Sequence, residues 1–294
     1  MALRLEGPTG EAVAAGPSVR GQWSGYGRVM GLTDAEVAIA AALAGAEVVA
    51  RNYGSTHERF AKSATDFATE TDIDAEHAII NVLETHRPAD ARTGEESGDS
   101  GPRAGSRRWL IDPLCGTLNF AAGTPLVAVN VALLQDDRNS AAAAADPMAD
   151  ELFWTDGSGA FIRRGSGDRR LTPTSRSSLI EINCDGPLDR PFVGGQLVSD
   201  PRLRAGYGPR VISSTLGVAW VAAGRRAAYI SDGWFRENLH FAAGIAIAEA
   251  AGCVISDLVG DLLHTGRGLV VSADPATHQA VLELVRPHLA DMER

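Results

Sequence analysis

The chain has 294 residues, of which 45% are hydrophobic and 22% are charged, and its formal net charge is −10. This length is enough to bury a large core in one domain or in two closely packed domains. The negative charge argues against nonspecific nucleic-acid binding, and the lack of a long uncharged apolar run argues against a membrane span.

The N-terminal part of the sequence predicts a tail followed by a helix. Residues 1–30 are rich in Gly, Pro and Ser, which predicts a flexible arm. A helix is predicted from Thr33 to Tyr53, because Thr33 can cap it and Glu36 stands where a capping box places its carboxylate. Gly54 can end this helix.

The following elements are predicted from apolar periodicity and turn residues. After an extended polar segment, helices are predicted over 73–86, 215–223, 242–251 and 278–289. Strands are predicted over 107–111, 127–134, 179–183, 227–230 and 269–272, with a hairpin over 151–161. Helices and strands that mix without strict alternation predict a layered α/β or α+β fold. A polar stretch predicts a boundary between two subdomains, 31–178 and 179–294.

The three cysteines are far apart in the sequence and odd in number: Cys115, Cys184 and Cys253. This spacing argues against a disulfide framework, and no signal peptide is visible. We therefore expect a cytoplasmic protein in which Cys184 and Cys253 belong to the core.

Three short motifs carry the groups that can do chemistry. In chain order they are Gly94-Glu95-Glu96-Ser97, Asp112-Pro113-Leu114-Cys115-Gly116-Thr117 and His240-Phe241-Ala242-Ala243-Gly244. Together with segments 62–72, 146–153 and 221–224, in the same order, they make the chain resemble the inositol monophosphatase family from about residue 35 onwards. Several weak motifs in the right order are more specific than any one of them.

The resemblance implies a fold, an assembly and a metal site. The fold would be a layered αβαβα sandwich of the sugar-phosphatase kind, with a cleft between its two subdomains, and the protein would be a homodimer. One Mg²⁺ ion would be held by Glu95, Asp112 and the carbonyl group of Leu114, which are the oxygen ligands that this ion prefers.

The resemblance also implies roles in hydrolysis. Thr117 and Asp72 would orient the attacking water, with support from Asp66. Gly116 and Thr117 would bind phosphate at a helix N-terminus, where free N–H groups favour an anion. The segment around Ser213 stands where the family contacts its substrate, although its residues differ from the family pattern.

Two positions depart from the family at one further metal site. Cys115 stands where the second motif has an Asp, and His240 stands where the last motif has an Asp. Four interpretations remain open. One metal remains and His240 acts as an acid or cation; or Asp112, Cys115 and His240 bind a softer ion such as Zn²⁺; or Cys115 is a nucleophile paired with His240; or catalysis is lost and only binding remains.

A structural role is the alternative for each single residue. Cys115 can be a small buried residue, His240 can be a packing histidine, and Asp72 can be a helix cap. Because Cys115 and His240 replace two ligands of one ion, a remodelled site is favoured. The sequence predicts a divergent metal-dependent phosphatase for a small phosphorylated polyol, sugar or nucleotide. The alternative is a non-hydrolytic relative, a binding protein or an enzyme with other Cys115 and His240 chemistry that recognises a phosphorylated or sulfated metabolite.

Overall fold

The computed structural model describes residues 31–55, 59–61, 67–102, 105–136, 138–186, 191–235, 238–263 and 267–292. The chain divides into residues 1–31 and residues 32–294, and the second unit is the one described below. The tail predicted over residues 1–30 therefore lies outside the described residues. No helix within the described ranges has the length and apolar character needed to cross a membrane.

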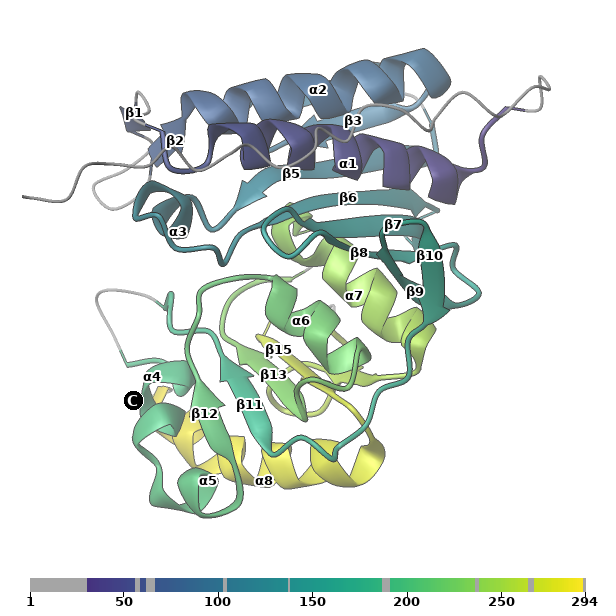
Figure 1. Ribbon diagram of the computed structural model, residues 1–294. Coiled ribbons are helices and arrows are strands. Elements are labelled where there is room, and N and C mark those ends of the chain that lie inside the picture. The colour runs from purple at the N-terminus through teal and green to yellow at the C-terminus, as the bar shows by residue number, and fades with distance from the viewer. Residues whose placement is uncertain are drawn as a thin grey trace, which may run out of the picture. The chain divides into compact units, whose positions relative to one another are not determined.

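The first half of the folded unit is a sheet of eight described strands under two long helices (Figure 1). The helices are α1 (Asp34–Asn52) and α2 (Glu70–His86). The strands are β3 (Ala91–Gly94), β4 (Gly98–Ser100), β5 (Arg107–Cys115), β6 (Ala128–Gln135), β7 (Arg138–Asp146), β8 (Glu151–Thr155), β9 (Ala160–Arg164) and β10 (Gly167–Arg170). Their order is β10-β9-β8-β7-β6-β5-β3-β4, and β3 and β5 are parallel while the other pairs are antiparallel.

Two smaller features flank this sheet. Strands β1 (Arg59–Ala61) and β2 (Phe67–Thr69) form an antiparallel pair before α2. The short helix α3 (Thr117–Ala121) lies between β5 and β6. In Figure 1, α3 lies at the end of β5.

The second half is a five-stranded sheet in the described part of the chain, with the order β12-β11-β13-β15-β14. Its strands are β11 (Leu179–Ile182), β12 (Gly208–Arg210), β13 (Ala228–Ser231), β14 (Val254–Ser256) and β15 (Leu269–Ser272). Its helices are α4 (Val193–Ser199), α5 (Pro201–Gly206), α6 (Leu216–Ala222), α7 (Leu239–Ala251) and α8 (Pro275–Met292). Strand β11 is parallel to β12 and β13, and the other pairs are antiparallel.

The folded unit has five layers in the order helix, sheet, helix, sheet, helix (Figure 1). Because successive side chains of a strand point to opposite faces, each sheet contributes side chains to two apolar clusters, one on each face. Trp109 and Ile111 pack under α1 and α2, whereas Leu110 packs against α6 and α7. In the second sheet Tyr229 faces α6 and α7, whereas Ile230 faces α4, α5 and α8. The predicted αβαβα architecture is confirmed.

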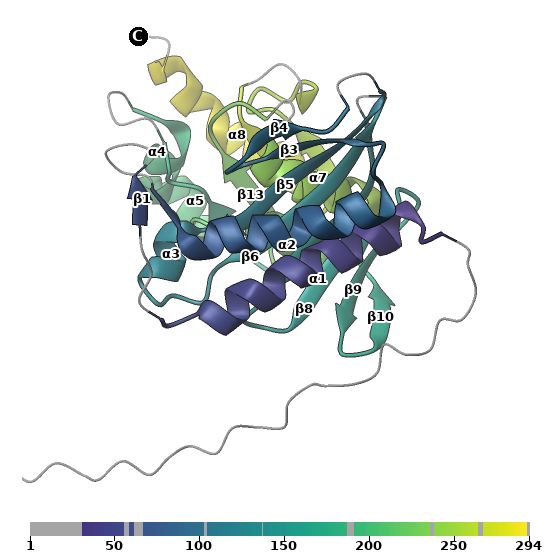
Figure 2. The ribbon, with the colours of Figure 1, turned by 90° about the horizontal axis from the view of Figure 1, so that it is seen from above.

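The first helix forms for the local reason that its sequence suggests. The Glu36 backbone N–H donates to Thr33 Oγ1 at 3.2 Å, and the Glu36 carboxylate accepts from the Thr33 N–H at 2.8 Å. The predicted capping box is therefore confirmed. Figure 2 shows α1 and α2 side by side over β5 and β6, so both helices bury one face against the same sheet.

Several boundaries differ from the predicted ones. Helix α2 begins at Glu70, three residues earlier than expected, and α7 begins at Leu239 rather than at residue 242. Strand β7 was not predicted, and β10 lies inside the polar stretch proposed as the subdomain boundary. The division after residue 178 stays a proposal about the organisation of the chain.

Candidate functional site

Two acidic side chains lie together where the parallel strands β3 and β5 run towards their C-terminal ends. Strands β3 and β5 are parallel neighbours with Gly94 opposite Ile111, so Glu95 and Asp112 directly follow a matched pair. The Glu95 N–H donates to the Ile111 carbonyl group at 3.1 Å, which holds Glu95 beside β5. The Asp112 side chain is fully buried. The sheet therefore places two carboxylates together that are 17 residues apart in sequence.

An imidazole reaches the same place from α7. His240 Nδ1 lies 3.0 Å from Asp112 Oδ2 and 3.8 Å from Glu95 Oε2. His240 is in the first turn of α7, which Asn238 caps by accepting a hydrogen bond from the His240 N–H at 3.1 Å. One ligand atom from each of Glu95, Asp112 and His240 lies within 4.8 Å of the others.

These groups fit a divalent cation. Two carboxylates are the usual anionic ligands for hard divalent ions, and an imidazole extends the set to transition metals. Asp112 Oδ1 is buried and accepts no hydrogen bond from any residue that the structure describes, so it still has bonding capacity. The oxygen of the Leu114 carbonyl group, the third predicted ligand, lies 3.2 Å from Thr117 Oγ1 and is the longer of two alternative acceptors for the single Thr117 hydroxyl proton.

The predicted water-orienting pair is in contact. Thr117 Oγ1 donates to Asp72 Oδ1 at 3.0 Å, and the Asp72 side chain is fully buried. Asp72 Oδ2 accepts from the Thr69 N–H at 2.7 Å and from Thr69 Oγ1 at 2.5 Å. Asp72 thus belongs to the capping box of α2 and also holds Thr117, so the two interpretations of this residue are compatible. Asp66 lies outside the described residues.

The predicted phosphate segment is joined to the predicted substrate segment by one side chain. Asn119 Nδ2 donates to the carbonyl groups of Leu126 at 3.0 Å and Ser213 at 3.1 Å. Gly116 is the N-cap residue before α3 and has a φ of 93°, and a Cβ atom there would lie 2.9 Å from the Leu126 oxygen. The Ser213 hydroxyl donates to Asp185. The loop that carries Ser213 therefore lies against the start of α3.

Cys115 has a different environment from His240. It is the last residue of β5, and it packs against the apolar cluster between the first sheet and helices α6 and α7. Burial and the negative charge of Asp112 raise the pKa of the Cys115 thiol well above its usual value, although Thr215 hydrogen-bonds to it. A thiol with a raised pKa stays protonated at neutral pH and is then a poor nucleophile. Cys115 is not in the group that Glu95, Asp112 and His240 form.

A buried glutamate supports the site and was not predicted. Glu76 is 1% exposed and accepts hydrogen bonds from the backbone N–H groups of Glu96 at 2.9 Å and Ser97 at 2.8 Å. It therefore fixes the turn after β3 that carries Glu95. Its position four residues after Asp72, on the same face of α2, was the available sequence signal.

A polar pair behind Asp112 was also missed. Asn130 Nδ2 donates to Thr215 Oγ1 at 3.0 Å and approaches Asp112 Oδ2 at 3.4 Å. Asn130 is 2% exposed in strand β6, whose other residues are apolar except for Gln135 at its end, and a polar residue in the middle of such a strand is the signal that could have revealed it.

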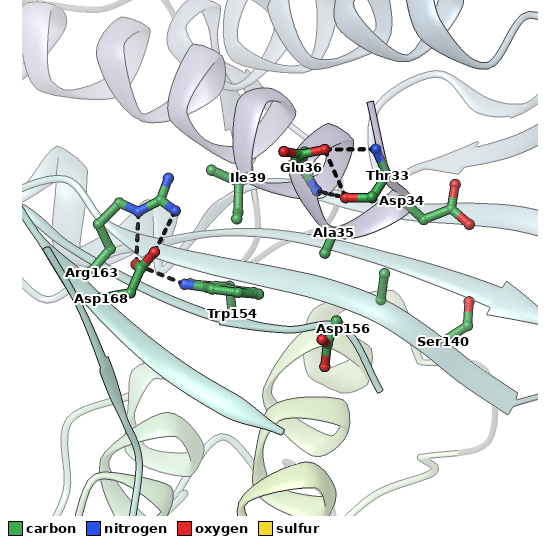
Figure 3. Close-up of a pocket in the computed structure, with 11 residues that line it drawn as sticks. Thr33, Asp34, Ala35, Glu36, Ile39, Ser140, Trp154, Asp156, Arg163 and Asp168 are labelled. Carbon is green, nitrogen blue, oxygen red and sulfur yellow. Dashed lines mark hydrogen bonds and ion pairs between the residues drawn. The ribbon is translucent and has the colours of Figure 1, made fainter. Parts of the chain in front are cut away.

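A separate cavity lies between the start of α1 and strands β7 to β10 (Figure 3). Its volume is about 500 Å³, and none of the site residues above line it. Some of its polar groups bond to one another: Asp168 accepts from Arg163 at 2.8 Å and from Trp154 Nε1 at 3.0 Å. The candidate site at the end of β5 is separate from this cavity.

Comparison with known proteins agrees with the motifs. The sequence model of the inositol monophosphatase family matches residues 33–290. The chain is 32% identical to an inositol-1-monophosphatase of Mesorhizobium japonicum over 86% of this chain and 96% of that protein. It is also 32% identical to Nus factor SuhB of Escherichia coli K12, over 87% of this chain and 96% of that protein.

A solved structure supports the same assignment. The extragenic suppressor protein suhB from Bartonella henselae superposes with a TM-score of 0.76 at 27% identity, over 85% of this chain and 97% of that one. The family match covers most of the chain, and both sequence relatives match over nearly their whole length. The chain therefore belongs to the inositol monophosphatase family, a family of metal-dependent phosphatases.

Proposed function

We propose that the chain hydrolyses a phosphate ester of a small polyol, sugar or nucleotide. The observation that carries this proposal is the contact between Thr117 and Asp72 at the end of β5, where Glu95 and Asp112 also meet. Groups that can orient a water molecule and groups that can bind a cation are thus neighbours, as hydrolysis of a phosphomonoester requires. By family resemblance we also propose a cytoplasmic homodimer.

Glu95, Asp112 and the Leu114 carbonyl group are the residues that would hold a divalent cation, for which the resemblance suggests Mg²⁺. Such an ion supplies Lewis-acid stabilisation of the negative charge that develops on the phosphoryl group. The Asp112 side chain is fully buried and the Glu95 side chain is mostly buried, so water is largely excluded from this region. Electrostatic interactions are stronger in such a low-dielectric environment than in water.

Thr117 and Asp72 orient the attacking water. Because the Thr117 hydroxyl donates its proton to the Asp72 carboxylate, its oxygen lone pairs are directed to accept a hydrogen bond. A water that donates to this oxygen presents its own lone pair to the phosphorus atom. Asp72 is fixed by its two bonds from Thr69, so the geometry is set before the substrate binds.

The rest of the substrate is held by the start of α3 and by the 213 loop. The backbone N–H groups of Gly116 and Thr117 bind the phosphate, and Ser213 contacts the group that carries it. His240 would support the leaving oxygen, either directly or by helping to hold a cation there. Cys115 replaces a family carboxylate, and its part in the reaction is tested with the variants below.

The proposal is tested by phosphate release from polyol, sugar and nucleotide monophosphates with Mg²⁺, Mn²⁺ or Zn²⁺. We expect release by the wild type and a loss of about 100-fold or more in Asp72→Asn. Asp72 accepts from Thr117 on one oxygen and from the Thr69 N–H on the other, so the NH₂ group of Asn must face one of these two donors. A folded wild type that hydrolyses nothing overturns the proposal, above all if the double variant Cys115→Asp, His240→Asp is active.

The second candidate is a binding role without hydrolysis. Two observations favour it: two family carboxylates are replaced by Cys115 and His240, and relatives at 32% identity are named Nus factors. It predicts an inactive wild type, with activity restored in the double variant, because the remaining groups of the site are in place. The same assay therefore separates the two candidates.

A further inference from the structure

We propose that His240 Nδ1 joins Glu95 and Asp112 in binding one divalent ion, which makes a mixed nitrogen and oxygen site that selects Mn²⁺, Co²⁺ or Zn²⁺ over Mg²⁺. This inference rests on the proposed function because it concerns the divalent ion that the proposed function assigns to Glu95 and Asp112. It replaces Cys115, which the sequence placed beside Asp112 and His240, by Glu95 as the third ligand.

The distances are close to those of ligands around one ion. Nitrogen and oxygen ligands bind these metals at about 2.0–2.2 Å, so two ligands of one ion lie about 2.8–3.6 Å apart at octahedral or tetrahedral angles. His240 Nδ1 is 3.0 Å from Asp112 Oδ2 and 3.8 Å from Glu95 Oε2. An ion between the three atoms therefore requires only small side-chain movements.

Burial gives a second and independent reason for an ion. The Asp112 side chain is fully buried, and its Oδ1 atom accepts no hydrogen bond from the described residues. Removing a carboxylate oxygen from water without a partner is costly, whereas coordination to a metal compensates for the lost hydration. This oxygen belongs to the residue that His240 and Glu95 already approach.

The surrounding groups hold the three ligands in place. Asn238 caps α7 and so fixes the turn that carries His240, and Glu76 fixes the turn after Glu95. Asn130 approaches the ligand oxygen of Asp112 from behind at 3.4 Å. Such supporting contacts are typical of metal sites, where they orient the ligands.

The donor set determines which ions are preferred. Mg²⁺ binds oxygen ligands and keeps several waters, whereas imidazole is a good ligand for transition metals such as Zn²⁺. The affinity of a mixed nitrogen and oxygen site for divalent transition metals rises from Mn²⁺ to Co²⁺. Replacing the family's Asp by His240 therefore shifts the site away from Mg²⁺. Cys115 packs towards α6 and α7 and is outside this group, so the softest side chain nearby is not a ligand.

The inference is tested with Co²⁺, whose visible absorption reports its ligands, and with calorimetric titrations of Mg²⁺ and Mn²⁺. We expect the full-length wild type to bind Co²⁺ and Mn²⁺ about tenfold or more tightly than Mg²⁺. His240→Ala should lose about tenfold or more of the Co²⁺ affinity and change the Co²⁺ spectrum, with a smaller effect on Mg²⁺. His77→Ala, at an exposed histidine of α2, and Cys115→Ser should leave both unchanged.

Two results would overturn the inference. One is an unchanged Co²⁺ affinity and spectrum in a folded His240→Ala variant. The other is a thiolate-to-cobalt charge-transfer band that disappears in Cys115→Ser, which would place the ion on Cys115. Both readouts are independent of phosphate release. A protein that binds Co²⁺ through His240 but hydrolyses nothing fails only the proposed function, whereas hydrolysis without a His240 effect on Co²⁺ fails only this inference.

Discussion

Glu76 offers the sharpest test of how α2 supports the site. Its carboxylate is 1% exposed and accepts backbone hydrogen bonds from Glu96 and Ser97. In Glu76→Gln, one oxygen remains and an NH₂ group faces the second backbone donor. The variant loses one charge-assisted hydrogen bond, worth about 1.5–3 kcal/mol, and turns an NH₂ group towards a part-buried backbone N–H, at a further cost of about 1 kcal/mol.

We therefore expect Glu76→Gln to lower the free energy of unfolding by about 3 kcal/mol, measured by urea denaturation. Because the same turn carries Glu95, we also expect about tenfold weaker binding of Mn²⁺. The matched control is Glu84→Gln on the same helix. Glu84 has a 54% exposed side chain and pairs with the buried Arg92 at 3.1 Å. Because the Gln side chain can turn its amide oxygen towards Arg92 and its NH₂ group towards water, we expect a loss of about 1 kcal/mol.

The reasoning is refuted if Glu76→Gln and Glu84→Gln unfold at the same urea concentration with equal slopes. It is also refuted in part if Glu76→Gln is destabilised but binds Mn²⁺ like the wild type. In that case Glu76 would stabilise the fold without positioning Glu95.

Three further predictions concern other parts of the unit. Gly116→Ala should lower the free energy of unfolding by about 2–4 kcal/mol in a thermal or urea assay, because its backbone is left-handed and the new Cβ atom would contact a carbonyl oxygen. Gly123 also has a left-handed backbone but has open space around it, so Gly123→Ala should lower the free energy of unfolding by only about 1–2 kcal/mol. A smaller loss at Gly116 than at Gly123 would contradict this. Burial lowers the pKa of His278 below its usual 6.5, so the folded state favours the neutral imidazole. As the pH drops below 6.5, the unfolded chain takes up a proton at this residue before the folded protein does. The contribution of His278 to the free energy of unfolding is therefore fully present above pH 6.5 and is lost at lower pH. Unfolding curves at pH 7.5 and 5 should show this loss in the wild type and a smaller one in His278→Gln. Asn119→Ala removes the bonds to the Ser213 loop, and we expect KM to rise more than kcat falls; an unchanged KM would exclude Ser213 from substrate binding.

The sequence predicted those elements whose signals are local. The helix α1 carries its own capping box, and the 151–161 hairpin has its turn between two apolar runs, so both were predicted. Strand β7 was missed because its residues 141–145 are all alanine, which gives no β-branched or aromatic signal. Pairing with β6 on one side and β8 on the other makes this segment a strand, and neither partner is visible in the segment itself.

The roles of the site residues stay a prediction, whereas the way in which their side chains group can be compared with the structure. Family position placed Asp112, Cys115 and His240 around one ion, whereas the structure joins Asp112 and His240 to Glu95. The register of β5 is irregular between Asp112 and Cys115, and the Cys115 side chain packs against an apolar cluster. Such an irregularity depends on the contacts of the whole sheet, so the spacing of the motif does not reveal it.

The interface between α1 and β7 has a consequence for conformational entropy. Many residues of the apolar cluster that α1 and β7 share are alanines: Ala35, Ala38, Ala41, Ala42 and Ala46 on the helix, and Ala141, Ala143 and Ala145 on the strand. Alanine has no side-chain rotamers to lose on folding, so these residues are buried without that entropic cost. They also have no rotamers that could change afterwards. We expect methyl relaxation of these alanines to change little when the ion site two strands away is filled.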